Sequence, residues 1–262
     1  LALPLAALAA PAVAQPAWPN RPVRIVVPYP AGQGTDLFGR RFAEYYTRQF
    51  NHSFVVENRA GAGGNVGTAF VARAEPDGHT LLWGTNATHA ANEFMFANLG
   101  FDPVRDFEPI AGILRLGVVF YAYQQGELRT LADFVAMARA RPGQVSVGVP
   151  STTARAALEM VRRAAGLDLT AVPYTGSGQA MTGALRGDVA AVVDTLAGAL
   201  GAIRGNQVRA LGVSLGRRSE SLPDLATFRE QGVDVEVDAW NAFYAPRGTP
   251  REIITALNAA SN

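Results

Sequence analysis

The sequence contains no cysteine and no lysine. Without cysteine, disulfides, thiolate metal sites and cysteine nucleophiles are excluded. Without lysine, Schiff-base chemistry and the phosphate-binding loop that ends in Gly-Lys-Ser/Thr are excluded as well. All 23 basic side chains are therefore arginine, they are scattered along the chain, and the formal net charge is only +1. This pattern does not indicate a nucleic-acid surface, and we expect no nucleic-acid partner.

Charge and histidine are also scarce, since charged residues make up 17% of the chain and histidine occurs three times. The three histidines lack the spacing of a metal site, so we expect no bound metal. Hydrophobic residues make up 48% of the 262 residues. This composition is typical of a globular chain with room for one large or two ordinary domains.

The first ten residues form an apolar run that is too short to span a bilayer. Ala12-Val13-Ala14 then fits a small-x-small cleavage site, so residues 1–14 are interpreted as the end of a secretory signal without its starting Met and basic region. A buried hydrophobic N-terminus is the alternative. Cleavage would leave Gln15 rather than a lipidated cysteine first, so the mature protein is expected to be soluble in the periplasm.

Three β-loop-α units occur in the first ninety residues, with strands expected at 23–27, 54–57 and 80–83. This alternation predicts an α/β fold with a mostly parallel sheet and binding loops at the carboxyl ends of the strands. We place the crossing to a second lobe near the strand expected at 117–123. Valines alternate with acidic residues at 233–237, which predicts a half-exposed strand that returns the chain to the first lobe. Further strands are expected at 145–149, 169–172, 189–193 and 208–214.

The loop at 28–36 joins the first strand to a helical pattern and carries the glycines of a tight turn. Thr35 or Asp36 can cap this helix, and the backbone N–H groups at a helix N-terminus attract anions. A second loop of this kind opens a helix at Pro150. Arg155 lies in the first turn of that helix, where the helix dipole disfavours a cation. It is placed either to meet a carboxylate or as a solvated surface arginine. For Asp36 and Asp194, each at a helix start, capping is favoured over acid–base chemistry.

Two motifs suggest chemistry. Gly212-Val213-Ser214-Leu215-Gly216 matches the serine hydrolase elbow. However, all three histidines precede Ser214, no helix pattern follows it, and no oxyanion loop is evident. The glycines at 61–67 resemble a dinucleotide fingerprint, but the last glycine comes one residue late. We therefore expect no enzyme, no catalytic residue and no cofactor, and keep a serine hydrolase that uses Ser214 as an alternative.

From Trp18 onward, several segments follow one another in the order and spacing of a known family. They include Val26-Val27-Pro28-Tyr29-Pro30-Ala31-Gly32 and the segments at 55–65, 76–78, 84–89, 101–107, 172–177 and 245–250. In these segments the chain resembles the substrate-binding proteins of tripartite tricarboxylate transporters, the Bug-type periplasmic receptors. The family normally continues beyond the point where this sequence ends.

The resemblance implies a two-lobed type II periplasmic binding protein fold, in which each lobe is a mostly parallel sheet flanked by helices, with a hinge cleft. Residues 22–117 and 240–262 would form lobe 1, and residues 118–239 would form lobe 2. The lobes would close on a di- or tricarboxylate or an aromatic carboxylate and deliver it to membrane transporter subunits. A receptor that reports its ligand to a membrane sensor is the alternative. The protein is expected to be a monomer.

The resemblance and the loop pattern together predict the ligand-binding residues. Those of lobe 1 are Tyr29, Ala31, Gly32, Gln33, Gly34, Thr35, Asp36, Thr85 and Asn86, and those of lobe 2 are Ser151, Thr152, Arg155, Tyr174, Gly176, Asp194 and Thr195. Two positions depart from the family pattern. Gln33 replaces the second of two paired glycines, and the loop at 149–155 retains only Thr152 of the usual Gly-Asn-Gly-Thr-Ser-Ser-His. We expect ligand choice to depend on Gln33 and Arg155.

Overall fold

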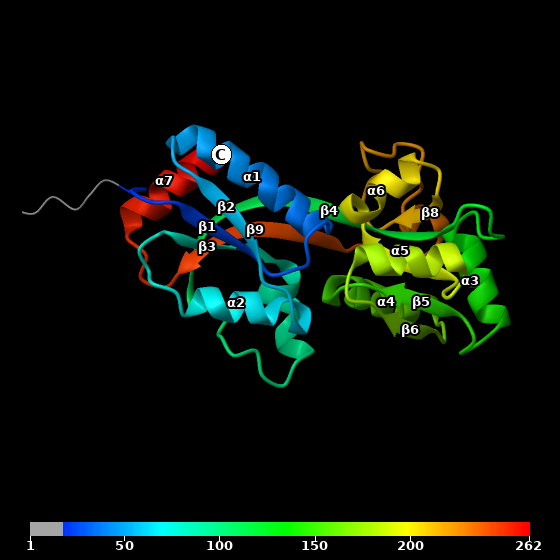
Figure 1. Cartoon of the computed structure of the whole chain (residues 1–262). Helices are drawn as coiled ribbons and strands as arrows, with labels where there is room; N and C mark the ends of the chain where they lie inside the picture. Colours follow the sequence, from blue (N-terminus) through cyan, green and yellow to red (C-terminus); the bar gives the residue numbers. More distant parts are fainter. Residues whose placement is uncertain (1–17) are drawn as a thin grey trace, which may run out of the picture.

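The computed structural model describes residues 18–262, which form two lobes joined by long strands (Figure 1). The signal sequence predicted at residues 1–14 lies outside the described residues. The strands are β1 (Val23–Val27), β2 (Phe54–Asn58), β3 (Thr80–Thr85), β4 (Phe107–Tyr123), β5 (Ser146–Val149), β6 (Thr170–Pro173), β7 (Ala191–Thr195), β8 (Val208–Val213) and β9 (Asp238–Pro246). The main helices are α1 (Gly34–Phe50), α2 (Asn65–Ala72), α3 (Leu131–Ala140), α4 (Thr152–Ala165), α5 (Ser177–Arg186), α6 (Leu196–Arg204) and α7 (Arg251–Ser261). Short helical turns are η1 (Ala62–Gly64), η2 (Ala87–Ala91), η3 (Asn92–Phe94) and η4 (Arg229–Gln231).

The sheets confirm the predicted α/β architecture. In the first lobe, β1 pairs in parallel with β2 and β3, and β9 joins the edge of β3 in the antiparallel direction. In the second lobe, β5 pairs in parallel with β6 and β7. Parallel strands require crossover helices, and in both lobes these helices cover the two faces of the sheet (Figure 1).

Each lobe has its own hydrophobic core. In lobe 1, α1 and α7 pack on one face of the sheet, where Tyr46, Trp83 and Phe243 are fully buried. The ring centroids of Trp83 and Phe243 lie 4.6 Å apart in an edge-to-face arrangement. On the other face, Val71 of α2 packs against Val26 and neighbouring strand residues. In lobe 2, α3 and α4 cover one face, and α5 and α6 cover the other.

The chain crosses between the lobes on β4, which is longer than the sequence predicts. From Phe107 to Gly117 this strand pairs with β9, and from Val118 onward it pairs with β7 and β8. The sequence predicts a strand only from Gly117 onward, so it misses the ten residues of β4 that precede Gly117. Pro109 and Gly112 hide the earlier part, because each lies at a shift in register with β9 and weakens the sequence signal of a strand. We propose Gly117 and the start of β9 as the lobe boundaries.

The prediction of a strand at 233–237 is wrong, although buried valines do alternate with exposed acidic residues there as the sequence indicates. Val233 and Val235 are buried in the lobe 2 core, and the acidic residues between them are exposed. The backbone forms no strand ladder here. Instead, Val235 N donates to Val233 O, and Val237 N donates to Ser214 O. The strand that returns to lobe 1 is β9, which begins at Asp238.

Ser214 connects this returning segment to the crossing strand. Its side chain is fully buried, and its Oγ accepts a hydrogen bond from Val118 N at 2.8 Å and donates one to Val237 O. Both bonds hold backbone groups that would otherwise be buried and unpaired. A nucleophilic serine must be exposed to substrate and activated by a base. The hydroxyl of Ser214 is enclosed and engaged with the backbone, which argues against the serine hydrolase alternative.

Among residues 18–262, no helix combines the length and apolar character needed to cross a membrane.

We expect Ser214→Ala to lower the free energy of unfolding by about 1–3 kcal/mol, because it leaves Val118 N and Val237 O without their side-chain partner. Denaturant unfolding followed by circular dichroism measures this change. Ser221→Ala is the matched control, since Ser221 is exposed and should change stability by less than about 0.5 kcal/mol. Equal stability of the two variants would contradict the role of Ser214.

Candidate ligand-binding cleft

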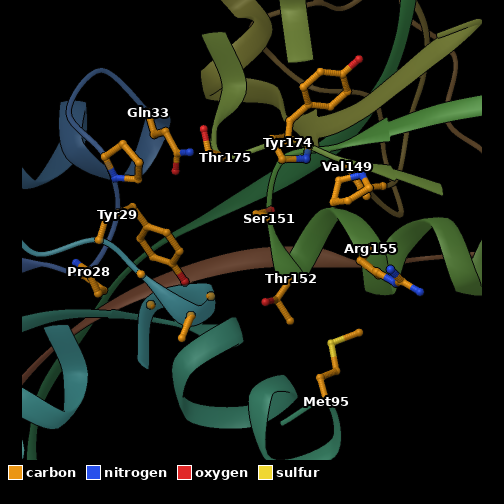
Figure 2. Close-up of a pocket in the computed structure, with 18 of the residues that line it drawn as sticks. Pro28, Tyr29, Gln33, Met95, Val149, Ser151, Thr152, Arg155, Tyr174 and Thr175 are labelled. Carbon is orange, nitrogen blue, oxygen red and sulfur yellow. The ribbon is translucent and has the colours of Figure 1, made fainter. Parts of the chain in front are cut away.

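A cavity of about 770 Å³ lies between the lobes and is lined by residues from both (Figure 2). Lobe 1 contributes the loop after β1, the glycine-rich turn around η1, and Met95 and Phe96. Lobe 2 contributes the loops after β5 and β6 and the first turn of α4. Arg155 is the only charged residue in this lining, and most of the other lining residues are apolar or glycine. The cavity therefore suits a ligand with an apolar body and few charged groups.

A second, much smaller chamber of about 30 Å³ adjoins the cavity and shares Tyr29, Gln33 and Ser151 with it. Most of its lining residues are polar, and they include Thr85, Asn86, Ser177, Asp194, Thr195 and Asn241. A volume of this size holds one small polar group.

The loop that precedes α1 starts the helix differently from the prediction. Gln33, not Thr35 or Asp36, occupies the N-cap position, and no side chain caps the helix. Asp36 lies in the first turn, where its Oδ2 accepts from Gly32 N at 2.9 Å. Its Oδ1 accepts from Asn58 Nδ2 at 2.8 Å, and Arg40 Nε also donates to Oδ2.

These contacts make Asp36 part of the loop's framework. Burial alone would raise the pKa of Asp36, but the hydrogen bonds from Gly32, Arg40 and Asn58 and the charge of Arg40 together hold it below its ordinary value. Asp36 lines neither space, and its oxygens are already engaged by the protein. The carboxylate therefore shapes the loop and is not placed to contact a ligand directly.

Tyr29 borders both the cavity and the small chamber. Its hydroxyl forms a hydrogen bond of 2.8 Å with Thr85 Oγ1 at the end of β3. Burial raises the pKa of Tyr29 to about 12, although the bond to Thr85 opposes the shift. The ring therefore stays neutral and presents an apolar face to the cavity (Figure 2).

Four helices begin at this cleft, and their N-termini border it from both lobes. Ser151 caps α4 by accepting from Ala154 N at 3.1 Å, and Thr195 caps α6 by accepting from Gly198 N at 3.4 Å. Gln33 and Gly176 are the N-cap residues of α1 and α5. Helix N-termini carry partial positive charge and free N–H groups, so their convergence attracts an anion.

The two lobes touch across the cleft, and glycines make this approach possible. A Cβ atom on Gly34 would lie 3.1 Å from both Ala197 Cβ and Thr195 Oγ1 of the opposite lobe. A Cβ on Gly176 would lie 2.7 Å from Gln33 Nε2. Thr153 Oγ1 of α4 also donates to Asn86 Oδ1 of lobe 1 at 3.1 Å. The lobes are thus in contact in this structure, and the main cavity between them stays open at its edge.

Tyr174 does not point into the cavity. Its hydroxyl packs so closely on α5 that a Cβ atom on Gly183 would lie 2.2 Å away. Figure 2 shows the ring directed away from Tyr29 and Thr152. Only the backbone end of Tyr174 is therefore placed to meet a ligand.

Arg155 is exposed at the edge of the main cavity and has no salt-bridge partner within the described part of the chain. Asp194 is nearly fully buried at the small chamber. Burial raises the pKa of Asp194 to about 6, although the nearby Ser177 hydroxyl and the N–H and hydroxyl of Thr195 oppose the shift. Asp194 precedes the capping residue Thr195, so capping does not explain its position.

The predicted residues divide into three groups. Those that line the main cavity are Tyr29, Gln33, Ser151, Thr152, Arg155 and Tyr174. Those that line only the small chamber are Gly34, Thr35, Thr85, Asn86, Asp194 and Thr195. Those that line neither are Ala31, Gly32, Asp36 and Gly176.

Sequence reasoning missed several residues that border the two spaces. They include Gly61–Gly64 together with Met95, Phe96 and the β9 residues Trp240 and Asn241. The glycine-rich segment resembles an incomplete dinucleotide fingerprint, so its sequence is conspicuous but does not indicate a carboxylate site. The residues of β9 carried no local signal, because they come from a strand that returns from the other lobe. Within residues 18–262, no group of three or more His, Asp or Glu side chains is placed to hold a metal ion.

Comparisons with known proteins agree with this geometry. The model of the "Tripartite tricarboxylate transporter family receptor" matches residues 38–262. Protein BugT of Bordetella pertussis is 32% identical over 257 residues, which cover 97% of this chain and 78% of BugT.

Solved structures are similar over nearly the whole chain. An R. palustris protein with adipate has a TM-score of 0.90 at 34% identity, over 93% of this chain and 83% of that protein. MatC from Rhodopseudomonas palustris, with bound malate, has a TM-score of 0.86 at 32% identity, over 93% and 84% of the two chains. These neighbours confirm the two-lobed periplasmic binding protein fold and the resemblance found in the sequence. The chain belongs to the tripartite tricarboxylate transporter receptor family.

Proposed function

We propose that this protein captures a small carboxylate between its lobes and presents it to the membrane subunits of a tripartite transporter. The observation that carries this proposal is the convergence of four helix N-termini on a cleft whose main cavity has Arg155 as its only charged lining residue. Relatives of known structure hold adipate and malate, which are both dicarboxylates. The proposal places the protein in the periplasm and treats it as a monomer.

Helix ends alone do not supply enough binding free energy. One helix terminus stabilises a nearby charge by roughly 0.3–1 kcal/mol, or about 2 kcal/mol when partly buried. Micromolar affinity requires about 8 kcal/mol. Charge-assisted hydrogen bonds, at roughly 1.5–3 kcal/mol each, must supply the rest. Contacts from both lobes, formed when the cleft closes, are the source of these bonds.

The uneven size of the two spaces suggests how such a ligand is oriented. The small chamber accepts one polar group, so a carboxylate enters it, and the body of the ligand extends into the larger apolar cavity. Arg155 stands where a second anionic group would reach the edge of that cavity. Pull-down of membrane partners distinguishes delivery to a transporter from reporting to a sensor.

A thermal-shift screen with adipate, malate, citrate and benzoate tests the proposal. A ligand that binds only the folded state stabilises it, by about 2.7 kcal/mol at a hundredfold excess over its Kd. This stabilisation must raise the unfolding midpoint. We expect at least one of the four to raise the midpoint in a saturable way. Absence of any shift with well-folded protein would contradict the proposed function.

Arg155→Ala should weaken adipate binding by roughly two- to fivefold and hexanoate binding by less than about 1.5-fold. An exposed arginine contributes about 0.2–1 kcal/mol to a carboxylate that it meets, and hexanoate lacks the second carboxylate. Isothermal titration calorimetry measures both affinities. Arg163→Ala is the matched control, because Arg163 is exposed on α4 and lies outside the cavity. Equal weakening of both ligands would contradict the predicted contact.

Gly34→Val should weaken carboxylate binding by roughly tenfold or more, because the new side chain collides with Ala197 and Thr195 when the lobes meet. The collision lies between lobes, so the unfolding free energy of the free protein should change little. Small-angle scattering should show a larger radius of gyration with ligand present than for the wild type. Gly178→Val is the control, since a Cβ at Gly178 meets no atom within 4 Å. Unchanged affinity of Gly34→Val would refute the closure contact.

A further inference from the structure

Asp194 is a buried carboxylate with one oxygen that has no partner. Its side chain is 3% exposed at the end of β7. Oδ1 accepts from its neighbour Thr195 N at 2.7 Å. Oδ2 is inaccessible to solvent and has no hydrogen-bond partner within residues 18–262. Buried charges in proteins are normally paired or hydrogen-bonded, so this oxygen requires an explanation.

Within residues 18–262, no basic side chain forms a salt bridge with Asp194. On β4, Val119 lies opposite Asp194, and the nearby Tyr121 has a buried hydroxyl without a partner. Burial raises the pKa of the Tyr121 hydroxyl, and the negative charge of Asp194 adds to this rise.

Within residues 18–262, the other elements around Asp194 bring no charged side chain against it, and the titratable Tyr174 packs on Gly148 and Gly183 instead. On α5 and α6 the nearest groups are the Ser177 hydroxyl and Gly198, whose added Cβ would lie 3.1 Å from Asp194 Oδ2. On β5, the residues paired with β7 are Val147 and Gly148. On α1, the oxygens of Asp36 are engaged within lobe 1. The free cation Arg155 borders only the larger cavity.

Asp194 lines the small chamber into which the proposed function places a carboxylate. The N-termini of α1, α4, α5 and α6 line the same chamber through Gly34, Thr153, Ser177 and the cap residue Thr195. Four helix N-termini therefore attract an anion to a space that already contains a buried carboxylate. Two ionised carboxylates at this one small chamber would repel each other strongly, unless one of them took up a proton.

We infer that the ligand carboxylate is captured together with one proton, which Asp194 then shares with it. This inference rests on the proposed function. In the bound state the Asp194 carboxyl donates its O–H to the ligand carboxylate, and the helix N-termini carry the single remaining negative charge. The proton comes from solvent, no covalent bond is made or broken, and release of the ligand returns the proton.

The direction of the pH effect follows from the protonation states. Burial places the pKa of free Asp194 at about 6, so the group is mostly ionised at pH 8 in the empty protein. A ligand carboxylate beside it raises the pKa further, so binding takes up a proton above pH 6. Affinity should therefore be nearly constant well below pH 6 and should fall as pH rises above it. For a single linked proton the fall is about 50-fold between pH 6 and pH 8.

Other occupants of the chamber predict different behaviour. A ligand hydroxyl or ammonium group would donate to ionised Asp194, and affinity would then rise with pH. A bound water that bridges Asp194 to the protein would leave affinity independent of pH. The sign and size of the pH dependence therefore separate proton sharing from these two arrangements.

Isothermal titration calorimetry with adipate, malate, citrate and benzoate between pH 5.5 and pH 8 tests the inference. Titration at pH 7.5 in phosphate and in Tris, whose ionisation enthalpies differ, measures proton uptake directly. For the wild type we expect uptake of close to one proton and the fall in affinity given above. Uptake below about 0.2 proton, or affinity that is constant or rises with pH, would overturn the inference.

Asp194→Asn provides the variant test, because asparagine has nearly the same shape and keeps a donor without ionising. We expect its affinity to change less than about threefold between pH 6 and pH 8, with no proton uptake. Asp188→Asn is the matched control: it removes an exposed carboxylate of the same lobe and should keep the wild-type pH dependence.

The wild-type measurements decide the question even if Asp194→Asn does not fold. Retention of the full pH dependence by folded Asp194→Asn would overturn the role of Asp194. If none of the four carboxylates binds at any pH, the proposed function fails together with this inference. If a carboxylate binds without taking up a proton, only this inference fails.

Discussion

The cleft depends on one strand, β4, which is shared by the two lobes. Its first part pairs with β9 in lobe 1, and its second part pairs with β7 and β8 in lobe 2. One strand belongs to both sheets, so the carboxyl ends of the parallel strands in the two lobes face each other across a fixed crossing. The loops that start α1, α4, α5 and α6 all emerge at these ends. Ser214 holds the crossing to the returning segment through two backbone hydrogen bonds.

The cleft combines two opposing electrostatic features. Helix N-termini from both lobes favour a negative charge at the small chamber, whereas the buried Asp194 disfavours one. Asp36 shows the contrast, because hydrogen bonds from Gly32, Arg40 and Asn58 satisfy its oxygens and lower its pKa. Asp194 has only Thr195 N as a backbone donor, and burial raises its pKa. Two carboxylates at helix starts thus differ in their surroundings: Asp36 is satisfied within lobe 1, and Asp194 is the one that we propose to be linked to the ligand.

The main cavity and the small chamber divide the demands of recognition between them. The chamber has mostly polar lining residues and room for a single group, so in the proposed function it recognises the charge shared by all carboxylates. The main cavity is larger and mostly apolar, so in the same proposal it discriminates among the bodies that carry this group. Gln33 borders both spaces, and Arg155 lies at the edge of the main cavity. Both depart from the family pattern described for the sequence, and our prediction that ligand choice depends on them agrees with their place at the larger cavity.

Local signals in the sequence determined the α/β class, most of the parallel strands, the family and the loops that border the cleft. Apolar runs, glycine turns and helix starts are all short-range features, so they can be read along the chain. Tertiary structure alone decided the length of β4, because Pro109 and Gly112 mask a strand whose pairing is supplied by β9. It also decided that Tyr174 turns away from the cavity and that Ser214 is enclosed. The separate roles of Asp36 and Asp194 likewise depend on donors brought from distant segments, which no local pattern records.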